Sequence, residues 1–445
     1  MSNNKPNYTL PIIVMFFLFA MISFVTGFQN PFGVILKGQL ELSNFQSQLG
    51  NAANFIAYAF MGLPAGMILQ KKGYKFSAIA AVLVGLFGVV LMFVSSLFDD
   101  KTTIFSVYMT GAFVAGFSMC MLNTVVNPML NTLGGGGKTG NQLLQFGGAT
   151  NSLAATICPI LVGYLMGGEL KDLSLIQARP ALYIAMGIFA LALIVLAVSK
   201  LPEPILEEMA KADKSKKKVE KPSVAGLFKF NHYIFGVVAI FLYVGLEVGI
   251  PNMANLYMTN PLDKGGLELD TLLAGTLVGA YWFLMLVGRL LGGVLGGMVS
   301  SKMMLSTVAT IVILLIVGAI FTPATQVAIP LTDITAPLNI ILLVLCGLCT
   351  SVMWGAIFNL AAEGLGKYTA VASGLFMVMV CGGGILPLVQ GYVADIAGYI
   401  NSYWVLFAAA AYILFYAVIG SHVYRRDASA AEIEKEVREG ITVED

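Results

Sequence analysis

Charged residues are scarce in this sequence, since Asp, Glu, Lys and Arg together make up only 11% of its 445 residues. A soluble domain carries roughly 25% charged residues, because its surface faces water. Long polar stretches are also rare, and 58% of the residues are hydrophobic. This composition excludes an ordinary soluble protein and predicts a membrane protein.

Histidine and cysteine are sparse as well, with two and five residues, and neither supports a catalytic or metal site. Cys346 and Cys349 have the spacing of a metal pair, but no second pair or nearby histidine accompanies them. We interpret the cysteines as small packing residues in apolar runs.

The glycines at 134–137 and Lys138 follow no strand, so they indicate a turn and not a phosphate-binding loop. We expect no enzyme activity, no cofactor and no resident metal. The sequence leaves a Na⁺ site open and does not specify its ligands. The net charge of +1 gives no reason to expect a nucleic-acid partner.

Apolar segments long enough to cross a bilayer recur along the chain. About 20 apolar residues are needed for one crossing. Twelve segments have this length, at residues 10–36, 45–69, 76–98, 104–130, 141–166, 176–199, 233–258, 271–297, 303–321, 338–362, 371–395 and 402–423. We therefore predict an N-terminal six-helix half (1–199), a cytoplasmic linker (200–230), a C-terminal six-helix half (231–423) and a cytoplasmic tail (424–445).

Positive charges are distributed unevenly between the two sides of these segments. If the N-terminus is cytoplasmic, 19 of the 25 Lys and Arg residues lie in cytoplasmic segments, five lie in outside loops, and Arg289 lies within a helix. This distribution follows the positive-inside rule. It predicts a multi-pass protein with both termini in the cytoplasm, and we expect the membrane to be a bacterial inner membrane.

Two short sequence repeats relate the two halves of the chain. A Pro-x-x-x-Gly-Tyr segment begins at Pro159 and again at Pro387, 228 positions later. The segment 127–134 has a counterpart at 359–366, 232 positions later. The copies are six helices apart, so they have the same orientation in the membrane. Parallel six-helix repeats are typical of the major facilitator fold, and we predict this all-α fold with twelve transmembrane helices.

A basic segment follows the second predicted helix, at residues 66–75. It resembles the cytoplasmic loop motif of major facilitator transporters, with Gln70 where an acid is usual. We expect Gly73 to make the turn and basic side chains to bind the carbonyls at helix ends. Lys71 and Lys72 are therefore candidates for a cytoplasmic gate. A second gate pair is predicted between Arg289, in a glycine-rich segment, and Glu363.

Polar residues within apolar helices are the candidates for a binding site, because they are costly in a bilayer unless they face a cavity or a partner. Asn and Gln both donate and accept hydrogen bonds, and an indole stacks on the apolar face of a sugar. Any single Asn is also consistent with a hydrogen bond between helices, but the set indicates a hydrophilic cavity. The predicted substrate-binding residues are Gln29, Asn30, Asn123, Asn127, Gln145, Asn151, Asn252, Asn255, Trp282, Trp354 and Asn359.

Glu247 lies near the middle of its predicted helix and is the candidate for ion coupling. An intramembrane carboxylate exchanges a proton, binds Na⁺ or pairs with a cation such as Arg289. The sequence leaves these three roles open.

At these positions the chain resembles the fucose–galactose–proton symporter family. The matching stretches include 42–46, 150–152, 241–248, 281–282, 288–289, 363–367 and 387–391. The resemblance implies proton-driven uptake of a neutral hexose by alternating access. Acids that the family uses for coupling and sugar binding fall on Asn30 and Asn123 here, and a pocket Gln falls on or near Gly148, while a pocket Asn falls on Asn151. Some relatives are described as sodium-dependent.

The predicted function is uptake of a neutral monosaccharide (a hexose or deoxyhexose) by a secondary active transporter coupled to H⁺ or Na⁺. The alternatives are an uncoupled sugar facilitator, and after it an exporter of drugs or other small solutes, which the amide-rich set of side chains disfavours. A non-transporting sensor is the remaining reading. The expected partners are a small-molecule sugar, the coupling ion and the lipid bilayer, and we expect a monomer.

Overall fold

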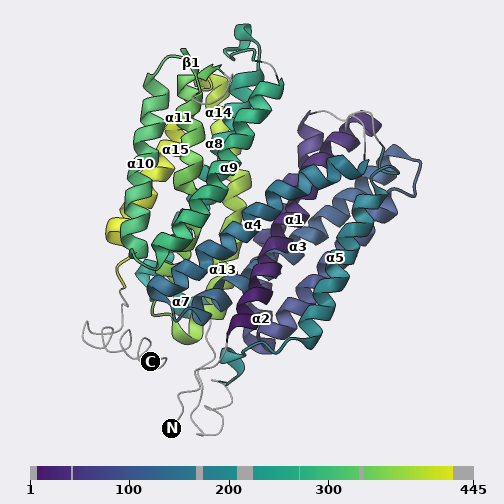
Figure 1. The fold of residues 1–445 in the computed structure, drawn as a ribbon, viewed down its shortest axis with the longest axis vertical. Coiled ribbons are helices and arrows are strands. Elements are labelled where there is room, and N and C mark those ends of the chain that lie inside the picture. Colours follow the sequence, from purple (N-terminus) through teal and green to yellow (C-terminus); the bar gives the residue numbers. More distant parts are fainter. Residues whose placement is uncertain are drawn as a thin grey trace. The chain divides into compact units, whose positions relative to one another are not determined.

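The computed structural model describes residues 8–41, 44–166, 174–207, 224–269, 271–329 and 335–423. Within these ranges nine helices are long and apolar enough to cross a membrane, judged by length and composition. Long helices are the expected result of these apolar runs, because a helix satisfies every backbone hydrogen bond within its own segment when water is absent. Figure 1 shows them as the dominant elements of the chain.

The first half of the chain forms five long helices. Their bounds are α1 Thr9–Leu40, α2 Asn44–Ser95, α3 Lys101–Leu133, α4 Gly137–Met166 and α5 Arg179–Val198, and a short α7 Val224–Leu227 follows. The range labelled α2 contains two predicted spans, which meet in a kink at Gly73, where φ is 79° and ψ is −177°. A positive φ is accessible to glycine without a steric penalty. The five helices therefore account for six of the predicted crossings.

The second half contains more breaks. The elements are α8 Asn231–Thr259, η2 Leu262–Lys264, α9 Thr271–Gly296, α10 Ser301–Phe321, β1 Gln326–Ala328, β2 Thr335–Pro337, α11 Leu338–Thr350, α12 Met353–Ala362, η3 Gly366–Tyr368, α13 Thr369–Val378, η4 Met379–Cys381, α14 Gly382–Ala397, α15 Tyr403–Phe415 and η5 Tyr416–Gly420. The two strands pair antiparallel, with Gln326 opposite Pro337. Each of α11 with α12, α13 with α14, and α15 with η5 corresponds to one predicted crossing. The predicted architecture of twelve crossings is confirmed.

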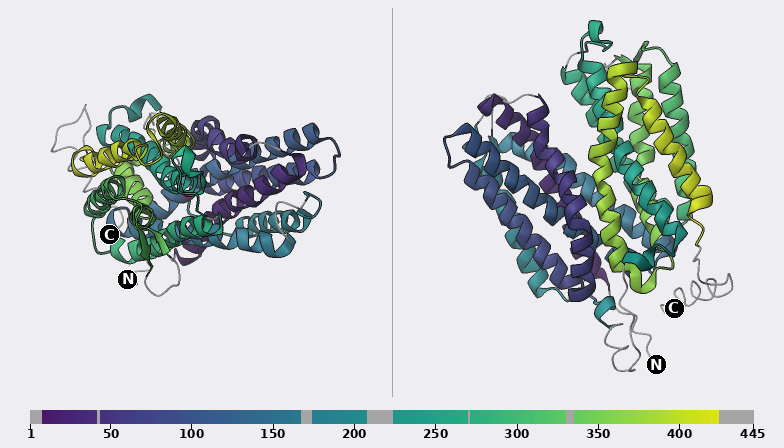
Figure 2. Two further views of the ribbon diagram at one scale, coloured as in Figure 1. Left: turned by 90° about the horizontal axis from the view of Figure 1, so that it is seen from above. Right: turned by 180° about the vertical axis from the view of Figure 1, so that it is seen from behind.

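Packing divides the chain into two compact units. One consists of Met1–Leu133, Thr150–Leu227 and Leu365–Val378, and the other of Gly134–Ala149, Phe228–Gly364 and Met379–Asp445. Figure 2 shows further views of the same helices. The units differ from the predicted halves by an exchange of two segments, the first part of α4 and all of α13. The division into halves at 200–230 stays a prediction.

The two exchanged segments are related by the internal repeat. The offset of 228 residues that separates Pro159 from Pro387 maps residues 137–149 onto 365–377. These are nearly the segments that each join the unit built largely from the other half of the sequence. The internal repeat predicted from the two short sequence repeats therefore has a counterpart in how the helices pack.

Helix α13 packs against α2 through glycines. A Cβ placed on Gly374 would lie 2.5 Å from the backbone oxygen of Gly62 and 2.8 Å from Cα of Gly66. A side chain at any of these positions would force the two backbones apart. Small residues that allow close approach are typical of helix contacts in membranes.

The turn at Gly73 is held by an acid that the sequence did not single out. The carboxylate of Glu203 accepts hydrogen bonds from the backbone nitrogens of Tyr74 (2.7 Å) and Lys75 (2.8 Å). Nζ of Lys75 donates to the carbonyls of Ala197 and Ser199, at 2.9 and 2.8 Å. The prediction that a basic side chain of this segment binds helix-end carbonyls is confirmed for Lys75. Helix N-termini favour a carboxylate and C-termini a cation.

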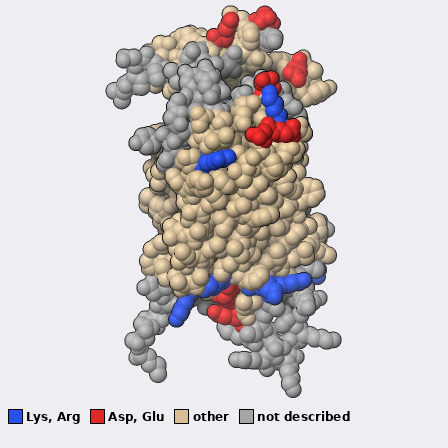
Figure 3. All heavy atoms as spheres, turned by 90° about the vertical axis from the view of Figure 1, so that its right-hand side faces the viewer, with Lys and Arg blue, Asp and Glu red and all other residues tan. Residues whose placement is uncertain are grey.

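Charged side chains are segregated on the face of the molecule shown in Figure 3. They gather toward the two ends, and a broad band between them is formed by other residues. Such a band matches a surface that contacts hydrocarbon.

Candidate functional site

The buried ion pair between Glu247 and Arg289 is the main feature of the candidate site. Nη2 of Arg289, on α9, lies 3.1 Å from Oε1 of Glu247, near the middle of α8. The side chains are only 11% and 14% exposed. A buried ion pair is costly to desolvate, and further hydrogen bonds are needed to offset this cost. The other hydrogen-bond partners of the two side chains therefore matter for the stability of the pair.

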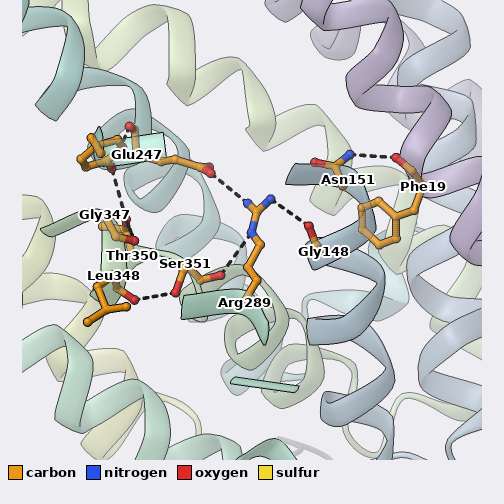
Figure 4. Close-up of polar contacts among 10 residues, drawn as sticks. Phe19, Gly148, Asn151, Glu247, Arg289, Gly347, Leu348, Thr350 and Ser351 are labelled. Carbon is orange, nitrogen blue, oxygen red and sulfur yellow. Dashed lines mark hydrogen bonds and ion pairs between the residues drawn. The ribbon is translucent and has the colours of Figure 1, made fainter. Parts of the chain in front are cut away.

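In addition to α8, Arg289 reaches helix α4 and the break between α11 and α12. Its Nη1 donates to the carbonyl of Gly148 on α4 at 3.2 Å, and its Nε donates to the carbonyl of Ser351 at 3.4 Å. Ser351 lies in the break between α11 and α12. Figure 4 shows the guanidinium between these groups. Its planar, five-donor geometry suits such a junction, which a lysine would not reproduce.

A proline places another hydrogen bond beside the pair. Pro251, inside α8, has no N–H to donate to the carbonyl of Glu247 four residues earlier. The hydroxyl of Tyr281 on α9 donates to this carbonyl at 3.1 Å, and lies 3.1 Å from the Thr350 hydroxyl. The backbone of Glu247 is therefore fixed to α9 independently of its carboxylate.

Replacing Tyr281 by phenylalanine is expected to destabilise the folded protein by about 1–2 kcal/mol, because the Glu247 carbonyl would then be buried without a donor. Thermal unfolding of the purified protein in detergent measures this change. Trp282→Phe, on the neighbouring and partly exposed residue, is the control and should change stability less. Equal stability of Tyr281→Phe and the unchanged protein would contradict this role of the hydroxyl.

A second intrahelical proline has a similar effect on α3. Pro128 leaves the carbonyl of Thr124 without its usual helical donor, and the hydroxyl of Ser373 on α13 donates to it at 3.1 Å. In both cases a hydroxyl from another helix donates a hydrogen bond to the carbonyl that lacks its helical donor because of the proline.

Asn123 and Asn127, two predicted substrate ligands on α3, are buried and bonded to protein. Nδ2 of Asn123 donates to the hydroxyl of Tyr58 on α2 at 2.8 Å. Nδ2 of Asn127 donates to the backbone oxygen of Asn123 at 2.8 Å. The structure brings these two amides together with Tyr58, which the sequence does not distinguish, because a tyrosine in an apolar run carries no distinctive signal.

Gln145 and Asn359 connect helices at two other points. Nε2 of Gln145 donates to the carbonyl of Val352, at the start of α12, at 2.8 Å. Nδ2 of Asn359 on α12 donates to the carbonyl of Gly137 at 2.9 Å and to the Ser301 hydroxyl at 2.7 Å. These two amides hold the first part of α4 against α12 and α10.

Asn151 is bonded to α1. Its Nδ2 donates to the carbonyl of Phe19 at 2.9 Å, as the right-hand side of Figure 4 shows. The side chains of Gln29 and Asn30, further along α1, lie outside the described residues. Their predicted roles stay predictions.

The remaining predicted ligands lie on α8, α9 and α12. Asn252 and Asn255 are exposed, and Trp282 is 39% exposed. Trp354 is half-buried, with its ring 6.3 Å from that of Tyr243. Tyr243 lies one helical turn before Glu247, so Trp354 is the predicted aromatic residue that packs against the turn of α8 preceding Glu247.

The predicted gate pairing of Arg289 with Glu363 stays a prediction. Glu363 is the C-cap of α12 and is exposed, whereas the ion pair that the structure gives Arg289 is with Glu247. The long side chain of Arg289 turns toward the interior of the helix bundle, where a carboxylate is available. Lys71 and Lys72 are exposed, and Nζ of Lys72 lies 5.7 Å from the ring centre of Phe76. The gate role of these lysines stays a prediction.

Long apolar helices, an internal repeat and a buried intramembrane ion pair together define a polytopic membrane protein of the transporter class. The family model described as Major Facilitator Superfamily matches residues 15–387. The chain belongs to the Major Facilitator Superfamily.

Curated relatives match over nearly the whole chain. A glucose/galactose transporter of Brucella abortus is 28% identical over 424 residues, which cover 94% of this chain and 96% of the relative. An L-fucose-proton symporter of Escherichia coli is 24% identical over 413 residues, covering 87% and 88%. The crystal structure of the E. coli fucose:proton symporter superposes with a TM-score of 0.76 at 20% identity, covering 93% of this chain and 98% of that one. This structural likeness shows the fold.

Proposed function

We propose that this chain is a symporter that takes up a neutral monosaccharide, a hexose or deoxyhexose, together with a proton. The relatives that match over almost their full length are named as glucose/galactose and L-fucose-proton transporters. The amide-rich set of intramembrane side chains suits hydroxyl groups, since each amide both donates and accepts.

The observation that carries the coupled mechanism is the Glu247–Arg289 pair. A carboxylate buried in the middle of α8 is costly, and such residues mark ion or proton pathways in transporters. Its partner Arg289 also contacts α4, which belongs to the other half of the sequence. We propose that Glu247 binds the coupling ion, and that the two halves open the cavity alternately to each side.

The proposed location is a bacterial inner membrane, with both termini in the cytoplasm. The 19-to-5 distribution of Lys and Arg across the predicted sides supports this orientation. In that orientation the described turn at Gly73 and the beginning of α4 are cytoplasmic.

Uptake by the purified protein in proteoliposomes tests this function. Labelled glucose, galactose and L-fucose are offered with an inward proton gradient, with an inward sodium gradient, and with neither. We expect accumulation of at least one sugar under the proton gradient, abolished by a protonophore. Accumulation driven by sodium and not by protons would make Na⁺ the coupling ion. If the sugar concentrations on the two sides only become equal under every condition, the protein is a facilitator. Absence of transport for every hexose would reject the substrate class.

A further inference from the structure

Gly148 on α4 lies directly against the side chain of Arg289. A Cβ placed on Gly148 would be 3.3 Å from Cδ, 3.6 Å from Nε and 3.9 Å from Cγ of Arg289. The arginine side chain therefore lies across the position into which a side chain at 148 would project. Because that space is free, Nη1 reaches the Gly148 carbonyl at 3.2 Å.

The same two helices are in close contact through glycines further along. A Cβ on Gly293 of α9 would lie 2.5 Å from the ring of Phe146, and one on Gly296 would lie 3.2 Å from Cα of Gln142. Along this line of contact α9 supplies the glycine and α4 the larger residue. At Arg289 the arrangement is reversed, and the glycine lies on α4. The reversal makes room for one side chain, that of Arg289.

The guanidinium consequently connects two helices that different halves of the sequence contribute. One of its nitrogens is bonded to α4 through Gly148 and another to the carboxylate on α8 through Glu247. The titratable and charged groups facing Glu247 are Arg289 and Tyr281 from α9, and Tyr243 from its own helix. Among them Arg289 is the group bonded to α4.

We propose that Gly148 is a positioning residue for ion coupling, because it ties the Glu247–Arg289 pair to the packing of α4 against α9. This inference rests on the proposed symport function. When the first part of α4 withdraws from α9 during transport, Arg289 loses the Gly148 carbonyl and its interaction with Glu247 changes. The affinity of Glu247 for the coupling ion then differs between the two arrangements, and such a differential interaction is what links ion binding to a conformational change.

The test replaces Gly148 with leucine and with alanine and compares two transport modes of the reconstituted protein. One mode is proton-driven accumulation. The other is counterflow, in which external labelled sugar exchanges for unlabelled sugar inside the vesicle without an imposed ion gradient. Leucine at 148 displaces the guanidinium, so we expect accumulation to fall about tenfold while counterflow stays within about threefold of the unchanged protein. Alanine requires Cδ of Arg289 to move by only a few tenths of an ångström, so a smaller fall in accumulation is expected. Gly187→Leu on α5, where an added Cβ meets nothing within 4 Å, is the control.

Several outcomes would overturn the inference. Accumulation by Gly148→Leu equal to that of the unchanged protein would do so, as would a parallel loss of both transport modes in a protein that remains folded, since that would make Gly148 a packing residue. If the leucine variant does not fold, the alanine variant decides: an unchanged ratio of accumulation to counterflow rejects the proposal. Absence of counterflow in the unchanged protein with every sugar would instead reject the proposed function. That result differs from those that reject only the role of Gly148, because they require an unchanged protein that transports sugar.

Discussion

Replacing Arg289 with methionine is expected to destabilise the folded protein by about 3–5 kcal/mol and to abolish sugar accumulation. Removing one partner of a buried ion pair leaves the other charge uncompensated in an apolar environment. Here the carboxylate of Glu247, 14% exposed, would lose the guanidinium 3.1 Å away. Methionine keeps most of the volume of the arginine stem, so the effect isolates the charge and its hydrogen bonds. Thermal unfolding in detergent and proteoliposome uptake measure the two parts of the result.

The double variant Glu247→Gln with Arg289→Met separates the causes of this loss. If the unpaired charge is responsible, neutralising Glu247 in the Arg289→Met background recovers much of the stability, whereas accumulation stays absent. A double-mutant cycle then gives the interaction between the two side chains directly. Stability of the double variant that is equal to, or lower than, that of Arg289→Met would show that the arginine acts through packing and through its bonds to Gly148 and Ser351.

Replacing Glu247 with glutamine is expected to lower the accumulation ratio of the sugar to about one, the value for uncoupled transport, while counterflow continues. The amide oxygen still accepts a hydrogen bond from Nη2 of Arg289, so the local geometry is largely retained. The side chain can no longer carry a negative charge or take up a proton, and the link between the ion gradient and the sugar is lost. Accumulation is measured with the proton and sodium gradients imposed separately.

A matched control for this substitution is Glu207→Gln, which removes an exposed carboxylate outside the membrane-spanning helices. It should leave both transport modes unchanged. Proton-driven accumulation that survives in Glu247→Gln would remove this carboxylate from the coupling step and leave it a structural partner of Arg289. Loss of counterflow together with accumulation would instead indicate that Glu247 contacts the sugar.

Much of the fold followed from the sequence, because hydropathy over about 20 residues is a local property. The twelve crossings were predicted with edges within a few residues, for example 271–297 against Thr271–Gly296 for α9. The two crossings within α2 meet at Gly73, the residue expected to make the turn, and its non-helical φ of 79° separates the two helices. The internal repeat was also visible, and it reappears in the two segments exchanged between the units.

The candidate site was predictable only in part. Glu247 and Arg289 stood out because charges are rare in the apolar helices, and their pairing was one of three roles left open for Glu247. Several amides predicted to bind substrate, such as Gln145 and Asn359, donate to backbone carbonyls of other helices. Sequence spacing cannot distinguish an amide that faces a cavity from one that faces a neighbouring helix, because both occupy the same kind of position in an apolar run.

The sequence by itself determined the class of protein, the number of crossings, the repeat and the residue types available for chemistry. These properties follow from composition and from patterns along a single helix. The tertiary structure alone decided that Arg289 pairs with Glu247, and that a second guanidinium nitrogen reaches Gly148, 141 residues away in the chain. Contacts of this kind depend on which helix faces pack together, and on whether a residue opposite is small enough to admit a guanidinium, which no local pattern specifies.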